Sequence, residues 1–185
     1  MPDKEKYGYG RHSRRSVRLK DYDYSQEGAS FVTICAKNRG CLFGEIVNDQ
    51  IIPNDLGFMI QQWWSKLSRK FPLIETDAHV LMPNHFHSII IIVGADPCVC
   101  PDLGAHTGAP LHKIVQWFKT VTTNEYLRIL KRQDVNTLGL KLWQRNYYEH
   151  IMRNERSLNA IRDYILNNPI RWSDDPENPV SFPDS

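Results

Sequence analysis

The sequence predicts a mixed α+β domain built around one hydrophobic core. Short β-branched runs at 31–36 and 85–93 are typical of strands, whereas apolar residues recur at helical spacing over 56–70 and 111–132. Hydrophobic residues make up 41% of the 185 residues, which suffices for a sizeable single core. No apolar run is long enough to cross a membrane or to serve as a signal core, so we expect a cytoplasmic protein.

The two ends of the chain differ in charge. Residues 1–20 contain seven basic and two acidic residues, whereas residues 173–185 contain four acidic residues and no basic one. We therefore expect a basic N-terminal arm over 1–30, a folded domain over 31–172 and an acidic, Pro-rich tail over 173–185. A basic arm suits a polyanionic partner.

Cysteine usage points to a reducing compartment. Cys35, Cys41, Cys98 and Cys100 are too few and too irregularly spaced for a disulfide framework, so free thiols are expected. The spacing of Cys98 and Cys100 also differs from that of a zinc knuckle.

The first elements are a strand over 31–36 and a helix over about 56–70. Residues 41–47 follow the turn at 38–40 and are predicted to pair with the first strand as a hairpin. In the helix, Trp63 and Trp64 are expected to be core or packing residues rather than a platform for bases.

Two strand segments, 79–82 and 85–93, flank Pro83 and Asn84. The interruption predicts either a tight hairpin or a bend in one long strand, and His79 is expected to be structural. The next segment, 94–110, contains three Gly and three Pro and reads as a long loop.

Two further helices are expected. The first spans 111–132, and its basic residues are predicted to form a solvated face: Lys113, Lys119, Arg128, Lys131 and Arg132. Residues 140–145 are expected to be a short strand or an extended segment. The last helix begins near Asn154, a suitable N-cap, and ends before Pro169.

His85 and His87 are the candidate metal ligands. Alternate side chains of a strand share a face, so both imidazoles point the same way while Phe86 points into the opposite layer. Two imidazoles on one rigid face can hold a divalent cation. They could instead be structural residues, but an otherwise apolar strand rarely carries two such groups without something that satisfies their polar atoms.

Tyr164 and Asn168 are four residues apart in the last helix and therefore lie on one side of it. Taken alone, such a tyrosine is commonly a packing residue. Combined with the histidines it offers a complete chemistry: His85, His87 and the Asn168 amide oxygen would bind Mg²⁺ or Mn²⁺, and the Tyr164 oxygen would attack a phosphate to give a phosphotyrosine.

These motifs resemble a known family. The segment 85–87 is similar to the His-hydrophobic-His motif of the HUH endonucleases, and 164–169 resembles the tyrosine motif of single-tyrosine transposases of small bacterial insertion sequences. The REP-associated tyrosine transposases are the most similar branch, through three further segments: 14–20, 82–87 and 148–153. The resemblance extends over about residues 10–172.

The resemblance implies a ferredoxin-like or RRM-like antiparallel sheet with helices packed against it and the catalytic tyrosine on a C-terminal helix. It further implies cleavage of single-stranded DNA near hairpins such as REP-like palindromes, which leaves a 5′-phosphotyrosine and a free 3′-OH. Carried over by position, Tyr164 is the nucleophile and His85 and His87 are metal ligands. Asn168 is the third ligand, although relatives have Gln or His there, so His150 is held in reserve.

The arm would contact DNA through Arg11, Arg14, Arg15 and Arg18. The oligomeric state is expected to be a monomer, with a homodimer as the alternative. Two other functions stay open: a non-catalytic module that binds structured nucleic acid, and a metallonuclease that uses water as its nucleophile.

Overall fold

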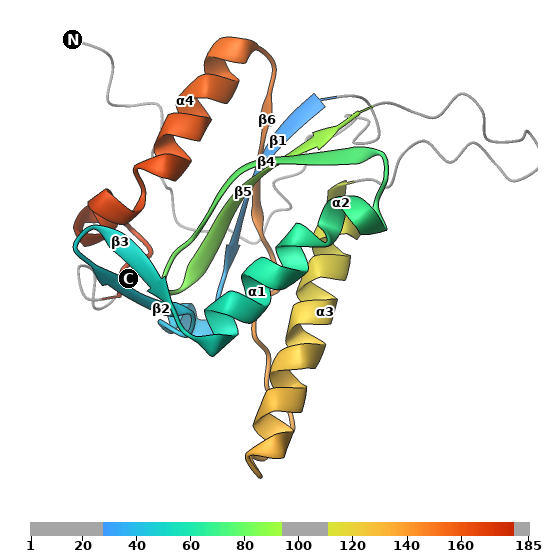
Figure 1. The fold of residues 1–185 in the computed structure, drawn as a ribbon, viewed down its shortest axis with the longest axis vertical. Coiled ribbons are helices and arrows are strands. Elements are labelled where there is room, and N and C mark those ends of the chain that lie inside the picture. The colour runs from blue at the N-terminus through green and yellow to red at the C-terminus, as the bar shows by residue number, and fades with distance from the viewer. Residues whose placement is uncertain (1–27, 94–110, 180–185) are drawn as a thin grey trace, which may run out of the picture.

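The fold is a four-stranded antiparallel sheet with helices on both faces (Figure 1). A computed structural model describes residues 28–93 and 111–179. Along the sheet the strand order is β4-β5-β1-β6, and the strands are β1 (Gly28–Cys35), β4 (Ile74–Leu81), β5 (His85–Ile92) and β6 (Tyr148–Met152).

Two helices follow the order that defines the ferredoxin-like fold. Helix α1 (Asp55–Ser65) lies between β1 and β4 in the chain, and α3 (Leu111–Arg132) lies between β5 and β6. This β-α-β-β-α-β order, with β1 and β5 at the centre of the sheet, is the ferredoxin-like arrangement. The predicted fold class is confirmed.

The helices divide the hydrophobic residues into two layers (Figure 1). Helices α1 and α3 pack on one face, where Val32, Ile34 and Phe86 are buried. Helix α4 (Glu155–Leu166) covers part of the other face, where Phe31 and Ile89 are buried. Neighbouring residues of one strand alternate between these layers, because successive side chains point to opposite faces.

A tight hairpin at Pro83 and Asn84 joins β4 to β5. Of the two predicted alternatives, a hairpin and a bend in one long strand, the hairpin is therefore correct. The Met82 amide donates to the His85 carbonyl at 2.8 Å. Strand β4 starts at Ile74, earlier than predicted, and its register with β5 shifts between Thr76 and His79. The His79 ring lies beside Trp64 in the helical layer, consistent with a structural role.

The predicted pairing of 41–47 with the first strand is wrong. Strand β2 (Gly44–Val47) pairs instead with β3 (Gln50–Pro53) in a separate hairpin. Asn48 and Asp49 form its two-residue loop, both with positive φ (49° and 60°), as favoured hairpin turns require. Strand β1 could not have accepted this partner, because β5 and β6 already occupy both of its edges.

The predicted helices are present with small differences. The first one breaks at Lys66 into α1 and the short α2 (Leu67–Lys70). Trp64 is buried against Phe86 and Phe118, and Trp63 is half-buried, so both tryptophans are packing residues.

Lys119 corrects the prediction of an entirely solvated basic face on α3. Its side chain is half-buried, and the ammonium group donates to the carbonyls of Gln144 and Arg145 at 2.7 and 2.9 Å. Burial lowers the Lys119 pKa to about 8. The lysine therefore anchors the segment that leads into β6, whereas the other four basic residues of the set are exposed.

The C-terminal part includes one strand that was not predicted. Residues 140–145 are irregular apart from one bridge between Ala36 and Trp143, and the strand β6 follows them. Asn154 caps α4 as predicted, accepting from the Ser157 amide at 2.8 Å. A 3₁₀ segment, η3 (Pro169–Asp174), continues the chain.

Several predictions concern residues outside the described ranges: most of the arm, the loop at 94–110, Cys98, Cys100 and the end of the tail. Cys35 and Cys41 are free thiols, as expected. Among the described helices, none combines the length and the hydropathy that a membrane span requires.

Candidate functional site

The candidate site lies on the sheet face that α4 partly covers. His85 and His87 are almost fully buried there, with their ring centroids 4.4 Å apart. In the register with β1, His85 lies opposite Cys35 and His87 opposite Thr33. Phe86 points to the other layer and contacts Trp64 and Phe118. Because side chains alternate between the two faces of β5, the two histidines lie on one face and Phe86 lies in the hydrophobic core on the other.

His85 presents an unsatisfied nitrogen to the site. Its Nδ1 hydrogen-bonds the Asn84 Oδ1 at 2.8 Å. Its Nε2 is buried and has no hydrogen-bond partner among the described residues. Burial lowers the His85 pKa to about 3, with the Asn168 side chain acting in the opposite direction. The imidazole is therefore neutral at physiological pH.

His87 connects β1 to the tyrosine. Its Nδ1 lies 2.8 Å from the Thr33 hydroxyl, and its Nε2 lies 3.5 Å from the Tyr164 hydroxyl. Burial, and then the neighbouring His85, lower the His87 pKa well below its usual value. Both histidines are thus in the neutral form that can bind a cation.

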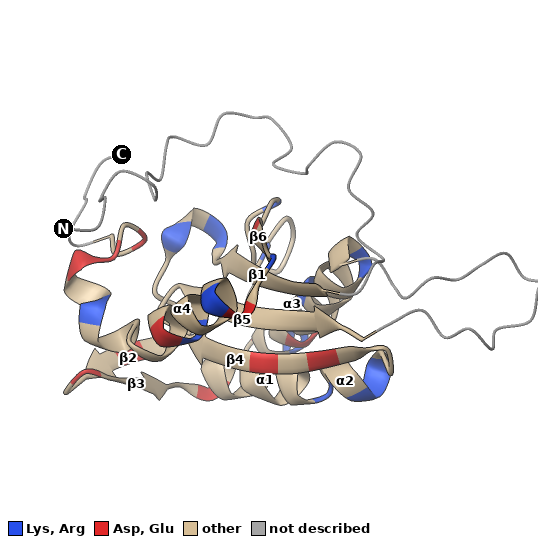
Figure 2. Cartoon of the chain, turned by 90° about the horizontal axis from the view of Figure 1, so that it is seen from above, with Lys and Arg blue, Asp and Glu red and all other residues tan. Residues whose placement is uncertain are grey.

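Tyr164 reaches the histidines because α4 packs its apolar side on the sheet. Ile165 is fully buried beside Phe31 and Ile89. Arg162 fastens the same helix to β4, since its Nε donates to the Asp77 carboxylate at 3.0 Å. Figure 2 shows acidic positions along β4, and both basic and acidic positions on α4.

Asn168 also reaches the site, from the residue that precedes η3. Its side chain is buried, and its Oδ1 has no hydrogen-bond partner among the described residues. A buried amide oxygen without a donor is energetically unfavourable unless another group satisfies it. Its influence on the His85 pKa indicates that the two side chains are neighbours.

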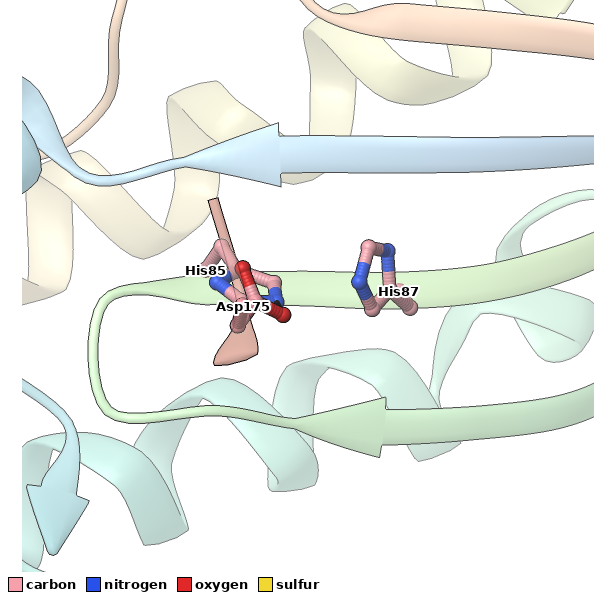
Figure 3. Close-up of side chains that lie close together, drawn as sticks. All are labelled: His85, His87 and Asp175. Carbon is pink, nitrogen blue, oxygen red and sulfur yellow. Dashed lines mark ion pairs between the residues drawn. The ribbon is translucent and has the colours of Figure 1, made fainter. Parts of the chain in front are cut away.

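Asp175 is a site residue that the sequence analysis did not single out. Its Oδ2 lies 3.9 Å from the His85 Nε2, and one ligand atom from each of His85, His87 and Asp175 lies within 4.8 Å of the others (Figure 3). Burial raises the Asp175 pKa to about 6. The charge pattern offered no signal, because it grouped Asp175 with the other acidic residues near the C-terminus; η3 turns it back onto the sheet.

His150, the reserve ligand, lies elsewhere. It is exposed on β6, opposite Phe31 in the register. Within the described part of the chain it belongs to no cluster of potential metal ligands.

The donor set fits a divalent cation. Two imidazole nitrogens and a carboxylate oxygen lie within 4.8 Å of one another, and the buried His85 Nε2 and Asn168 Oδ1 have no hydrogen-bond partner among the described residues. A cation would satisfy these lone pairs, and a set of two imidazole nitrogens with carboxylate and amide oxygens can bind a divalent metal ion.

Comparisons with known proteins support a transposase family. A family model described as IS200-like transposase matches residues 103–168, a range that contains Tyr164 and Asn168 but not the two histidines. An uncharacterised protein of Haemophilus influenzae is 42% identical over 181 residues, covering 92% of this chain and 96% of that protein.

A solved structure shares the fold. A REP-associated tyrosine transposase bound to a REP hairpin superposes with a TM-score of 0.53 and 23% identity, covering 88% of this chain and 81% of that one. A second structure, of a Deinococcus radiodurans protein described as a transposase, is less similar, with a TM-score of 0.42 and 16% identity over 82% of this chain and 97% of that one.

Proposed function

Since this chain belongs to the family of IS200-like transposases, we propose that it cleaves and rejoins single-stranded DNA with Tyr164 as nucleophile and a divalent cation as cofactor. The Tyr164 oxygen attacks phosphorus, so a Tyr–O–P bond forms while the bond between phosphorus and the 3′-oxygen breaks. The products are a 5′-phosphotyrosine and a 3′-hydroxyl, and the phenol proton is transferred to the 3′-oxygen. Reversal of these steps rejoins the strand.

The observation that carries this proposal is the 3.5 Å distance between the Tyr164 hydroxyl and the His87 Nε2. A module that only bound nucleic acid would have no need to bring a half-buried phenol to a pair of buried, neutral imidazoles. Proximity of the nucleophile to the group that holds the phosphate is what transfer chemistry requires.

The cation would be Mg²⁺ or Mn²⁺, held by His85 and His87 together with oxygen from Asp175 or Asn168, or from both. When bound it would polarise a phosphate oxygen and offset the charge that develops in the transition state. The two histidines, Asp175 and Asn168 are all buried, so this centre is shielded from water.

The substrate we propose is single-stranded DNA with a hairpin. The fold is shared with a REP-associated transposase that was solved with a REP hairpin. The basic arm would add phosphate contacts through Arg11, Arg14, Arg15 and Arg18, which predicts binding that weakens steeply with salt. We propose a monomer as the working form and the cytoplasm as the site of the reaction.

The test is covalent trapping. Protein is incubated with Mn²⁺ and a labelled library of single-stranded hairpin oligonucleotides, and a denaturant-resistant adduct is sought. We expect an adduct with the wild type and with Tyr148→Phe, which removes a hydroxyl from the same sheet face, but none with Tyr164→Phe.

Two other outcomes would contradict the proposal and identify what replaces it. Binding of hairpins without any adduct would indicate the non-catalytic binding module. Cleavage without an adduct, retained in Tyr164→Phe, would indicate a metallonuclease that uses water.

A further inference from the structure

Asn84 lies in the turn between β4 and β5 and is held firmly at its backbone. Its carbonyl accepts from the Ala36 amide at 2.7 Å, and the carbonyl of Pro83 accepts from the Phe43 amide at 3.0 Å. The side chain is 1% exposed. The turn therefore presents the Asn84 amide group in one position.

The orientation of that amide group is determined by its neighbours. Its Nδ2 donates to the carbonyl of Arg39 at 3.0 Å and to the carbonyl of Glu177 at 2.6 Å. Carbonyl oxygens only accept, so the reverse orientation would place Oδ1 against two other acceptors. Oδ1 therefore faces His85, where it lies 2.8 Å from Nδ1.

An acceptor at this distance requires a proton on the histidine nitrogen. We propose that Asn84 is a positioning residue that holds His85 in the tautomer with the proton on Nδ1, so that Nε2 keeps a free lone pair for the cation. In its use of a cation this inference rests on the proposed function. The Nε2 of His85 is buried, has no hydrogen-bond partner among the described residues, as Asn168 Oδ1 also has none, and lies 3.9 Å from the Asp175 Oδ2.

Asn84 differs in this respect from Thr33, which contacts the other histidine. A hydroxyl both donates and accepts, so the contact between Thr33 and the His87 Nδ1 does not by itself select a tautomer. In metal-binding histidines one ring nitrogen contacts the metal, and a group that hydrogen-bonds the other nitrogen commonly sets the tautomer. Here that group is an amide, which adds no charge to the buried site.

The same amide joins the two halves of the ligand set. Glu177, whose carbonyl accepts from Asn84, also forms an ion pair through its carboxylate with Arg39 at 3.2 Å. Its backbone amide donates to Asp175 at 2.7 Å. Asn84 thus contacts His85 directly and the Asp175 segment through one residue.

The experiment reads ring protonation in the metal-free, full-length protein. Protein with ¹⁵N-labelled histidine is examined by long-range ¹H–¹⁵N NMR near pH 7.5, and His85→Gln identifies the His85 signals. We expect His85 to be protonated at Nδ1 only in the wild type. Asn84→Ala should mix the tautomers and weaken Mn²⁺ binding about 10- to 100-fold.

Asn84→Asp separates positioning from a general role in packing. One carboxylate oxygen still accepts from His85 Nδ1, so the Nδ1 proton should persist, although the other oxygen faces the carbonyls of Arg39 and Glu177 and should lower the stability of the variant. Asn54→Ala, which removes the exposed N-cap of α1, is the control for a loss of stability without a change at the histidines.

Three results would overturn the inference: a proton on Nε2 of His85 in the wild type, an unchanged tautomer in Asn84→Ala, or loss of the Nδ1 proton in Asn84→Asp. The wild-type measurement tests the inference even if neither Asn84 variant folds. Absence of a DNA adduct together with the expected tautomers would contradict the proposed function and leave the role of Asn84 intact.

Discussion

The hydroxyl of Tyr164 lies 3.5 Å from the Nε2 of His87, although the two residues are 77 positions apart in the chain. Phe31 of the central strand β1 contacts both: its ring stacks on His87 with centroids 5.3 Å apart, and the Tyr164 ring meets it edge-on at 5.9 Å. The buried Phe31 ring therefore supports both His87 and Tyr164, the two residues on which the proposed chemistry depends.

Replacing Phe31 should weaken both stability and chemistry. Because this ring is 3% exposed, Phe31→Ala should lower the free energy of unfolding by about 3–5 kcal/mol. Urea denaturation measures this loss. Phe31→Leu, which keeps most of the volume, should lose less stability yet still slow adduct formation, since it removes the flat surface on which His87 and Tyr164 rest. Full adduct formation in Phe31→Leu would show that the ring only fills space.

The ion pair between Arg162 and Asp77 should matter for the reaction more than for cation binding. Asp77→Asn loosens α4 and with it Tyr164, while His85, His87 and Asp175 lie on other elements. We expect slower adduct formation with a Mn²⁺ affinity within about twofold of the wild type. Glu155→Gln is the matched control, because Glu155 is exposed and contacts the same arginine at 3.4 Å. A parallel fall in Mn²⁺ affinity would contradict this separation.

Asp175 should contribute to cation binding, unlike its exposed neighbour. We expect Asp175→Asn to weaken Mn²⁺ binding at least about tenfold and Asp174→Asn to leave it unchanged. Isothermal titration in the absence of DNA measures both. Since the Asp175 pKa is raised to about 6, wild-type affinity should also fall as the pH drops through 6. Equal Mn²⁺ affinities in the two variants would show that Asp175 is not a ligand of the cation.

The buried histidines should make the fold sensitive to acid. Their pKa values lie below the ordinary value of 6.5, so below about pH 6.5 the unfolded chain binds more protons than the folded one, and stability falls with pH. Each such group contributes up to about 1.4 kcal/mol per pH unit. Asp175 acts in the opposite direction between about pH 6 and 4, because its pKa is raised.

Urea denaturation at pH 7, 6 and 5 tests this balance. The wild type should lose stability toward pH 5, and Asp175→Asn, which lacks the opposing group, should lose it more steeply. A stability that is flat over this range would mean that the histidines are not buried in their neutral form.

Several parts of the fold followed from local patterns. Alternation along 85–93 placed the histidines on one face and Phe86 on the other, and Pro83 with Asn84 marked the interruption that proved to be a hairpin turn. Asn154 was identifiable as an N-cap because the cap uses only its own next residues. The ferredoxin-like arrangement and the approach of Tyr164 came from the family resemblance rather than from these patterns.

The errors share one cause. The segment 41–47 could be read as a strand, but its partner could not, since pairing depends on which edges of β1 other strands occupy. Lys119 was assigned to a solvated face because helical spacing says nothing of the segment that later packs over it.

The sequence by itself determined which side chains share a strand face or a helix side, because the periods of these elements are local properties of the backbone. It thereby identified His85, His87, Tyr164 and Asn168 as candidates. Only the tertiary structure decided that α4 delivers Tyr164 to His87, that η3 returns Asp175 to the histidines, and that Asn84 meets carbonyls of Arg39 and Glu177. These contacts join segments far apart in the chain, and their geometry follows from the packing of the whole sheet and its helices rather than from any local pattern.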